Sequence, residues 1–100
     1  MAAQDLHLPL AAVRSLCRRY HVRELAVFGS AVRGELTANS DLDLLVDFEV
    51  DAQIGFLALA RMQRELAGLA GRQVDLVPKS GLKPAIRDSV TSEAQVIYAT

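Results

Sequence analysis

Residues 41–48, with the sequence DLDLLVDF, alternate acidic and apolar side chains and constrain the fold more than any other part of the chain. Successive side chains of a β-strand point to opposite faces, so this segment would place its apolar residues on one face: Leu42, Leu44, Val46 and Phe48. The other face would carry Leu45 and three carboxylates, those of Asp41, Asp43 and Asp47. The pattern predicts a strand with one buried face and leaves its acidic face to be explained.

The rest of the sequence alternates between helical and extended patterns. Apolar residues recur at helical spacing in residues 10–20, 56–69 and 82–90, and short apolar runs at 25–28, 74–77 and 94–98 predict further strands. This order predicts the α/β (α+β) class, a small mixed β-sheet with helices packed on it. We expect residues 1–100 to form a single domain.

The composition excludes several classes of protein. A formal net charge of -1 gives no basic excess, so we expect no direct nucleic-acid binding. Cys17 is the only cysteine, which precludes an internal disulfide and fits a reducing compartment. The sequence contains neither a signal peptide nor the roughly 20 apolar residues of a membrane span. These features predict a soluble cytoplasmic protein with no membrane partner.

The acidic face of residues 41–48 has two interpretations. It could be the solvated face of an edge strand. Alternatively, Asp41 and Asp43, about 7 Å apart at ~3.3 Å per residue, could bind Mg²⁺, which prefers carboxylate oxygens. In QVDLVP, Asp75 also alternates with apolar residues and would join this face if the two strands are neighbours. Three carboxylates within ~4 Å would repel by several kcal/mol per pair, so they would need a cation. Asp47 lies farther along the strand and is left out of the site.

A second group of residues suits an anion. Gly29 follows an apolar run, and a glycine there lets backbone N–H groups approach a ligand. A short helix beginning at Ser30 would add free N–H groups, and Arg33 has a forked cation suited to phosphate. Ser40 offers another hydroxyl. Each feature alone is typical of an ordinary turn or a solvated side chain, but a phosphate cradle beside metal-binding acids indicates phosphoryl transfer.

These residues carry a family resemblance. Gly29-Ser30-x-x-Arg33-Gly34, followed after five residues by Ser40-Asp41-x-Asp43, resembles the signature of the polymerase-β-like nucleotidyltransferases. Over nearly its whole length the chain is similar to the minimal nucleotidyltransferase (MNT) branch, which implies the polymerase-β-like nucleotidyltransferase fold. The resemblance implies a catalytic, metal-binding triad that holds two Mg²⁺ ions and the triphosphate of ATP: Asp41, Asp43 and Asp75. Within it, Asp75 would also help to activate the acceptor hydroxyl. The residues implied to hold the phosphates are Gly29, Ser30, Arg33 and Ser40.

The resemblance also implies a partner. Many MNT proteins are encoded beside a HEPN-domain protein and act as antitoxins, by transferring AMP from ATP to a tyrosine of the HEPN toxin. The chain is therefore expected to be a protein adenylyltransferase of a toxin–antitoxin pair. Larger nucleotidyltransferases add a helical domain for which no residues remain here. We therefore expect a partner chain, or a second copy in a homo-oligomer, to complete the cleft.

Other functions stay open on the sequence. A small-molecule nucleotidyltransferase with an aminoglycoside-like acceptor would use the same acids, although the acceptor domain is missing. A non-catalytic antitoxin could neutralise its partner by binding alone, but it would not need the triad. Template-directed polymerisation is disfavoured because no basic nucleic-acid channel is evident.

Overall fold

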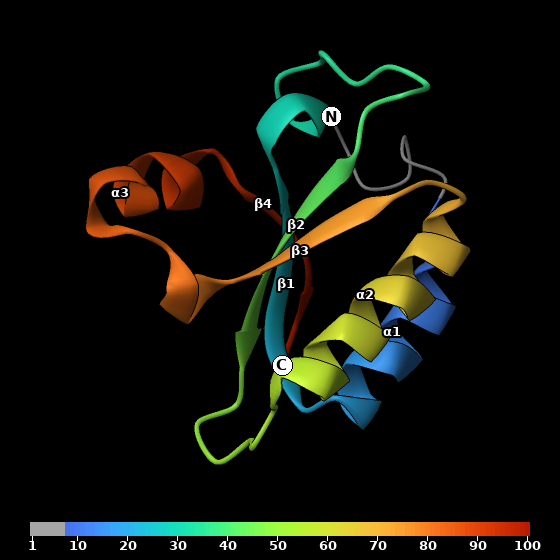
Figure 1. The fold of residues 1–100 in the computed structure, drawn as a ribbon, viewed down its shortest axis with the longest axis vertical. Coiled ribbons are helices and arrows are strands. Elements are labelled where there is room, and N and C mark those ends of the chain that lie inside the picture. The colour runs from blue at the N-terminus through green and yellow to red at the C-terminus, as the bar shows by residue number, and fades with distance from the viewer. Residues whose placement is uncertain (1–7) are drawn as a thin grey trace.

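The computed structural model describes residues 8–100, in which three α-helices pack on a sheet of four strands (Figure 1). The helices are α1 (Leu10–Arg19), α2 (Phe56–Ala70) and α3 (Pro84–Glu93). The strands are β1 (Val22–Phe28), β2 (Leu42–Phe48), β3 (Val74–Pro78) and β4 (Gln95–Ala99). Single 3₁₀ turns, η2 (Gly29–Ala31) and η3 (Lys79–Gly81), follow β1 and β3. The predicted fold class is confirmed; residues 1–7 of the domain predicted over residues 1–100 lie outside the described part of the chain.

The sheet is mixed and has the strand order β3-β2-β1-β4. β1 pairs antiparallel with both β2 and β4. β2 and β3 are parallel, which requires a crossover, and α2 provides it. In this register Asp43 lies opposite Asp75 on one side and opposite Phe28 on the other. The topology therefore brings the end of β1 and the start of β3 to the same point on β2.

The main core lies between the sheet and the helices α1 and α2, which run side by side over one face of the sheet (Figure 1). The apolar face predicted for β2 points into it, so Leu42, Leu44 and Val46 are fully buried. Burial raises the pKa of the Cys17 thiol to about 11, so the thiol stays neutral and packs as a small apolar group. Among residues 8–100, no helix combines the length and the apolar character that crossing a bilayer requires.

The opposite face of the sheet carries α3 and a second, smaller apolar cluster. Ala26, Leu45 and Leu82 form its buried part, and the half-buried Val90 and Ala94 pack against it. Leu45, which the alternation places among the aspartates, is thus covered by the segment that leads into α3. No residue of α3 itself is buried. The helix is consequently held to the sheet by few side chains.

Three details of the structure differ from what the sequence patterns predict. β1 begins at Val22, three residues before the predicted run, because buried Val22 pairs with Phe48. α3 begins at Pro84 and extends to Glu93, beyond the predicted end, because its polar last turn contributes no apolar periodicity. Phe56 begins the predicted apolar stripe of α2, yet it is 82% exposed at the first turn of the helix.

Candidate active site

Two carboxylates from neighbouring strands form the centre of the candidate site. Asp43 on β2 is in register with Asp75 on β3, and adjacent strands lie about 4.8 Å apart. Their sequence neighbours Leu42, Leu44 and Leu76 are buried in the main core, so both aspartates project from the other face. The register thus brings together two of the three predicted catalytic acids, although they are far apart in the sequence.

Asp41 lies immediately before β2, at the exposed end of the loop that follows η2. The loop is held from two sides. Arg72 donates hydrogen bonds from Nη1 to the carbonyl oxygens of Thr37 (3.0 Å) and Ser40 (3.4 Å). The hydroxyl of Ser40 accepts the Thr37 N–H at 3.0 Å and lies 2.9 Å from the Thr37 hydroxyl. Ser40, predicted to bind phosphate, uses its hydroxyl here to shape the loop that delivers Asp41.

The surroundings of Asp43 are short of positive charge. Burial raises the pKa of Asp43 above its ordinary value, and the nearby carboxylates of Asp75 and Asp41 raise it further. Arg33 opposes this effect, whereas the charge of Glu93 adds to it. The site therefore gathers negative charge that one arginine only partly offsets.

Carboxylate oxygens are suitable ligands for Mg²⁺, although the three acids do not form a complete metal site by themselves. Within residues 8–100, no three His, Cys, Asp or Glu side chains stand close enough together to hold an ion unaided. Mg²⁺ usually takes one or two carboxylates and completes its octahedron with water and substrate phosphates. The Asp43–Asp75 pair with Asp41 beside it meets that requirement. Metal binding by the three aspartates remains a prediction.

Gly29 is the point at which β1 meets the acids. It is buried and has a left-handed φ of +74°. A Cβ at this position would come closer than 3.0 Å to Oδ2 of Asp43 and to 3.2 Å from its Cγ. The position therefore excludes a side chain for two independent reasons, backbone conformation and contact with Asp43.

The predicted short helix after Gly29 is the single 3₁₀ turn η2. Ser30 lies half-buried within it, and the backbone N–H groups of Val32 and Arg33 both donate to the Gly29 carbonyl. The Arg33 side chain is exposed and donates from Nε to Glu35 at 2.6 Å. Gly29, Ser30 and Arg33 thus lie together at the end of β1, and their phosphate-binding role stays a prediction.

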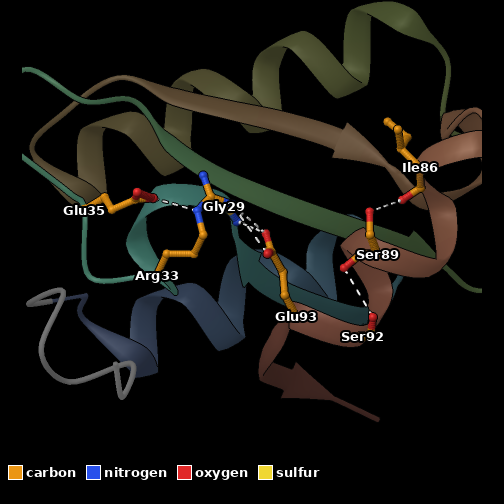
Figure 2. A network of polar contacts seen from close by, with 7 residues as sticks. All are labelled: Gly29, Arg33, Glu35, Ile86, Ser89, Ser92 and Glu93. Atoms are coloured by element: carbon orange, nitrogen blue, oxygen red, sulfur yellow. Dashed lines mark hydrogen bonds and ion pairs between the residues drawn. The ribbon is translucent and has the colours of Figure 1, made fainter.

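Glu93 is a residue of this site that the sequence analysis missed. It ends α3, and its Oε1 accepts the N–H of Gly29 at 2.8 Å (Figure 2). Arg33 Nη1 also lies 3.3 Å and 3.4 Å from its two carboxylate oxygens. The sequence shows only that Glu93 stands between the last helix and the last strand. Its proximity to Gly29 follows from the pairing of β4 with β1, which the sequence does not reveal.

Asp47 lies apart from these groups. Its carboxylate accepts a hydrogen bond from Arg23 Nε at 3.1 Å, near the start of β1. Asp47 thus pairs with an arginine away from Gly29, and its exclusion from the site stays a prediction.

Comparison with known proteins identifies the family. Residues 11–97 match the model of the nucleotidyltransferase domain. The chain belongs to this nucleotidyltransferase family. The protein adenylyltransferase MntA of Thermococcus cleftensis is 45% identical over 85 residues, which cover 85% of this chain and 82% of that protein. A candidate protein adenylyltransferase of Methanocaldococcus jannaschii is 38% identical over 84 residues, 83% of this chain and 82% of that one.

Solved structures agree with this nucleotidyltransferase assignment. A candidate minimal nucleotidyltransferase is 43% identical, matches with a TM-score of 0.77 and covers 95% of both chains. A chain from a toxin–antitoxin crystal structure with AMP-PNP has a TM-score of 0.76 at 22% identity, over 93% of this chain and 75% of that one. The second match shows the fold alone. The resemblance to minimal nucleotidyltransferases is confirmed.

The candidate site has an acidic side and a second side that we predict to bind anions, called the anion-binding side below. Asp41, Asp43 and Asp75 form the first, whereas the Gly29 N–H and the Arg33 guanidinium belong to the second. Gly29 joins them because it abuts the Asp43 carboxylate. A cation on the first side and a phosphate on the second would lie next to each other, an arrangement suited to transfer of a phosphoryl-type group.

Proposed function

We propose that this nucleotidyltransferase is a Mg²⁺-dependent protein adenylyltransferase. It transfers AMP from ATP to a tyrosine hydroxyl of a HEPN-domain toxin and so acts as the antitoxin of the pair. The observation that carries the proposal is the register of Asp43 with Asp75 beside the Gly29 turn. The similarity to a protein named MntA, a protein adenylyltransferase, supports the choice of a protein acceptor.

In this proposal the acids hold the metal and the turn after β1 holds the phosphates. Asp41 and Asp43 would bind Mg²⁺ together with Asp75. Bound there, the metal supplies neutralisation of the charge on the triphosphate and on the departing pyrophosphate. The Gly29 N–H, the Ser30 hydroxyl and the Arg33 guanidinium would donate to phosphate oxygens. These contacts orient the triphosphate and so determine which way its α-phosphorus faces.

Asp75 is suited to activate the acceptor. It is exposed, and β3 is an edge strand, so a tyrosine on another protein can reach it. Asp75 accepts the proton of the tyrosine hydroxyl, and the phenolic oxygen attacks the α-phosphorus of ATP. A new oxygen–phosphorus bond forms, the bond between the α-phosphorus and the bridging oxygen of the β-phosphate breaks, and pyrophosphate leaves. The product is a tyrosine that carries AMP.

The proposed partner rests on the relatives. Chains from toxin–antitoxin crystal structures share this fold, among them a chain from the complex of a tri-AMPylated Shewanella oneidensis HEPN toxin with MNT antitoxin, with a TM-score of 0.68. That match has 18% identity and supports the partner through the fold alone.

The test is label transfer from ATP to a purified HEPN-domain toxin that is mixed with this chain. With Mg²⁺ and ATP labelled at the α-phosphate, we expect label on the toxin, and none when the acceptor tyrosine is replaced by phenylalanine. Asp75→Asn is expected to reduce transfer by at least about 100-fold, the scale of a lost general base. Asp51→Asn, an exposed acid in the loop after β2, is the matched control and should transfer normally.

Two results would contradict the proposal. Normal labelling by Asp75→Asn would show that Asp75 is not needed for the transfer. Full neutralisation of the toxin by Asp75→Asn without any label would favour a non-catalytic antitoxin that acts by binding.

A further inference from the structure

The carboxylate of Glu93 lies on the anion-binding side of the site. Its Oε1 accepts the Gly29 N–H at 2.8 Å, and both of its oxygens lie within 3.4 Å of Arg33 Nη1 (Figure 2). The side chain is 30% exposed, so the carboxylate is accessible to solvent. One protein carboxylate thus uses a backbone donor and a guanidinium at once, as a bound anion would.

These two donors are the ones that the proposed function assigns to the nucleotide. A carboxylate oxygen and a phosphate oxygen accept hydrogen bonds from the same groups with similar geometry. The Gly29 N–H has a single hydrogen, which cannot point at both acceptors. Glu93 and a phosphate therefore compete for Gly29.

Electrostatic repulsion also opposes the simultaneous presence of Glu93 and a phosphate at these donors. Glu93 bonds to the N–H of Gly29, and Gly29 abuts the Asp43 carboxylate, so Glu93 adds a further negative charge next to the acidic side of the site. A triphosphate placed beside an unmoved Glu93 would meet another negative charge. Arg33 would also have to be shared between Glu93, Glu35 and the phosphate.

The attachment of α3 allows Glu93 to withdraw. None of its residues is buried, and the hydroxyls of Ser89 and Ser92 bond to carbonyls of the helix itself, so they do not tie it to the sheet (Figure 2). The helix packs on the sheet mainly through Val90, while Leu82 and Ala94 anchor its flanks. A change of side-chain rotamer at Glu93, or a small shift of the last turn, would free both donors.

We propose that Glu93 occupies the phosphate position at Gly29 and Arg33 in the nucleotide-free protein, and that a phosphate oxygen of the nucleotide displaces it. This inference rests on the function proposed above. Glu93 then sets nucleotide affinity: it holds the turn in place while the site is empty, weakens binding of the triphosphate, and promotes release of pyrophosphate by returning to the same donors.

The test compares Glu93→Gln with the unaltered chain in calorimetric binding of Mg²⁺ with a non-hydrolysable ATP analogue, and of Mg²⁺ with pyrophosphate. Glutamine keeps an oxygen acceptor for the Gly29 N–H and removes the charge. Because a charge-assisted hydrogen bond becomes a neutral one, we expect both ligands to bind about tenfold more tightly. Asp88→Asn, which removes another exposed acid of α3, is the matched control and should leave both affinities unchanged.

A second measurement follows Gly29 directly. In ¹⁵N-labelled protein, we expect its amide proton to resonate downfield, to move upfield in Glu93→Gln, and to respond to pyrophosphate in both proteins. Equal affinities in Glu93→Gln and the unaltered chain, or weaker binding by the variant, would overturn the inference while leaving the proposed function intact. If neither protein binds either ligand, the proposed function fails and the inference fails with it.

Discussion

Gly29→Ala offers the sharpest test of how the phosphate turn and the acids depend on each other. Gly29 and Gly34 share a left-handed φ of +74°. A Cβ at Gly29 would approach the Asp43 carboxylate to less than 3.0 Å, whereas a Cβ at Gly34 meets nothing within 4 Å. The two substitutions therefore impose the same backbone strain and differ in the contact with Asp43.

The shared strain sets the expected loss of stability. A left-handed conformation costs a residue with a Cβ about 1–2 kcal/mol, and 1 kcal/mol corresponds to roughly 4–8 °C in Tm for a domain of this size. Gly34→Ala should lose that amount alone. In Gly29→Ala the Asp43 carboxylate must also retreat to ordinary contact at 3.4 Å or more. A displacement of about 1 Å at a reacting centre costs roughly 100-fold in rate, so transfer should fall at least that far.

The assay is a thermal melt of both variants followed by single-turnover transfer well below the lower Tm. We expect similar losses of Tm within a few degrees and a difference in transfer rate of two orders of magnitude. Equal rates in the two variants would refute the argument that Gly29 is needed to make room for Asp43.

Three further outcomes are expected. Burial and neighbouring acids raise the pKa of Asp43, so its ionised form is unfavourable in the metal-free protein. Asp43→Asn should therefore keep or raise the Tm at pH 7, and it should abolish any Tm increase caused by Mg²⁺ with nucleotide. A clear drop in Tm would show that Asp43 has a structural role. Tyr20 donates to Glu65 at 2.5 Å and is the main cause of the lowered pKa of Glu65, so the stabilisation is present above the ordinary Glu pKa of 4.5 and lost as pH falls below it. Tyr20→Phe should therefore cost about 1 kcal/mol in urea unfolding at pH 7, with a smaller loss at pH 3, and a pH-independent loss would contradict this linkage. Arg72→Met removes two hydrogen bonds to the loop before Asp41 and should lower transfer several-fold with a stability loss of about 1 kcal/mol, whereas an unchanged rate would show that the loop positions Asp41 without this arginine.

The sequence predicted the elements that alternation and glycine placement specify. The apolar face of β2 follows from a period of two residues, and the same rule places Asp43 on the opposite face. Asp75 obeys the same alternation within its own strand. Its position beside Asp43 depended on the strand order, which no local pattern states, and the motif shared with a known family provided that information.

What the sequence could not predict depends on contacts between distant segments. Glu93 bonds to Gly29 because β4 pairs with β1, and nothing in residues 84–93 indicates an acid aimed at a glycine 64 positions earlier in the chain. Leu45 is covered by Leu82, which the helical pattern assigns to a helix. The hydroxyl of Ser40 closes a local turn with Thr37, which the sequence did not indicate, and its binding of phosphate stays a prediction. The Glu93 and Leu45 contacts are tertiary contacts that local patterns do not show, whereas the Ser40 contact is a local turn that competes with the predicted orientation.

The parallel pairing of β2 with β3 has a consequence for how such proteins can diverge. Asp43 and Asp75 are held opposite each other by the sheet itself, so the spacing between them does not depend on the length or conformation of the segment that links the two strands. Residues 49–55 can lengthen or shorten, and the exposed face of α2 can acquire new surfaces, while the acid pair keeps its geometry. Recognition of different acceptors could thus evolve on this crossover independently of the chemistry.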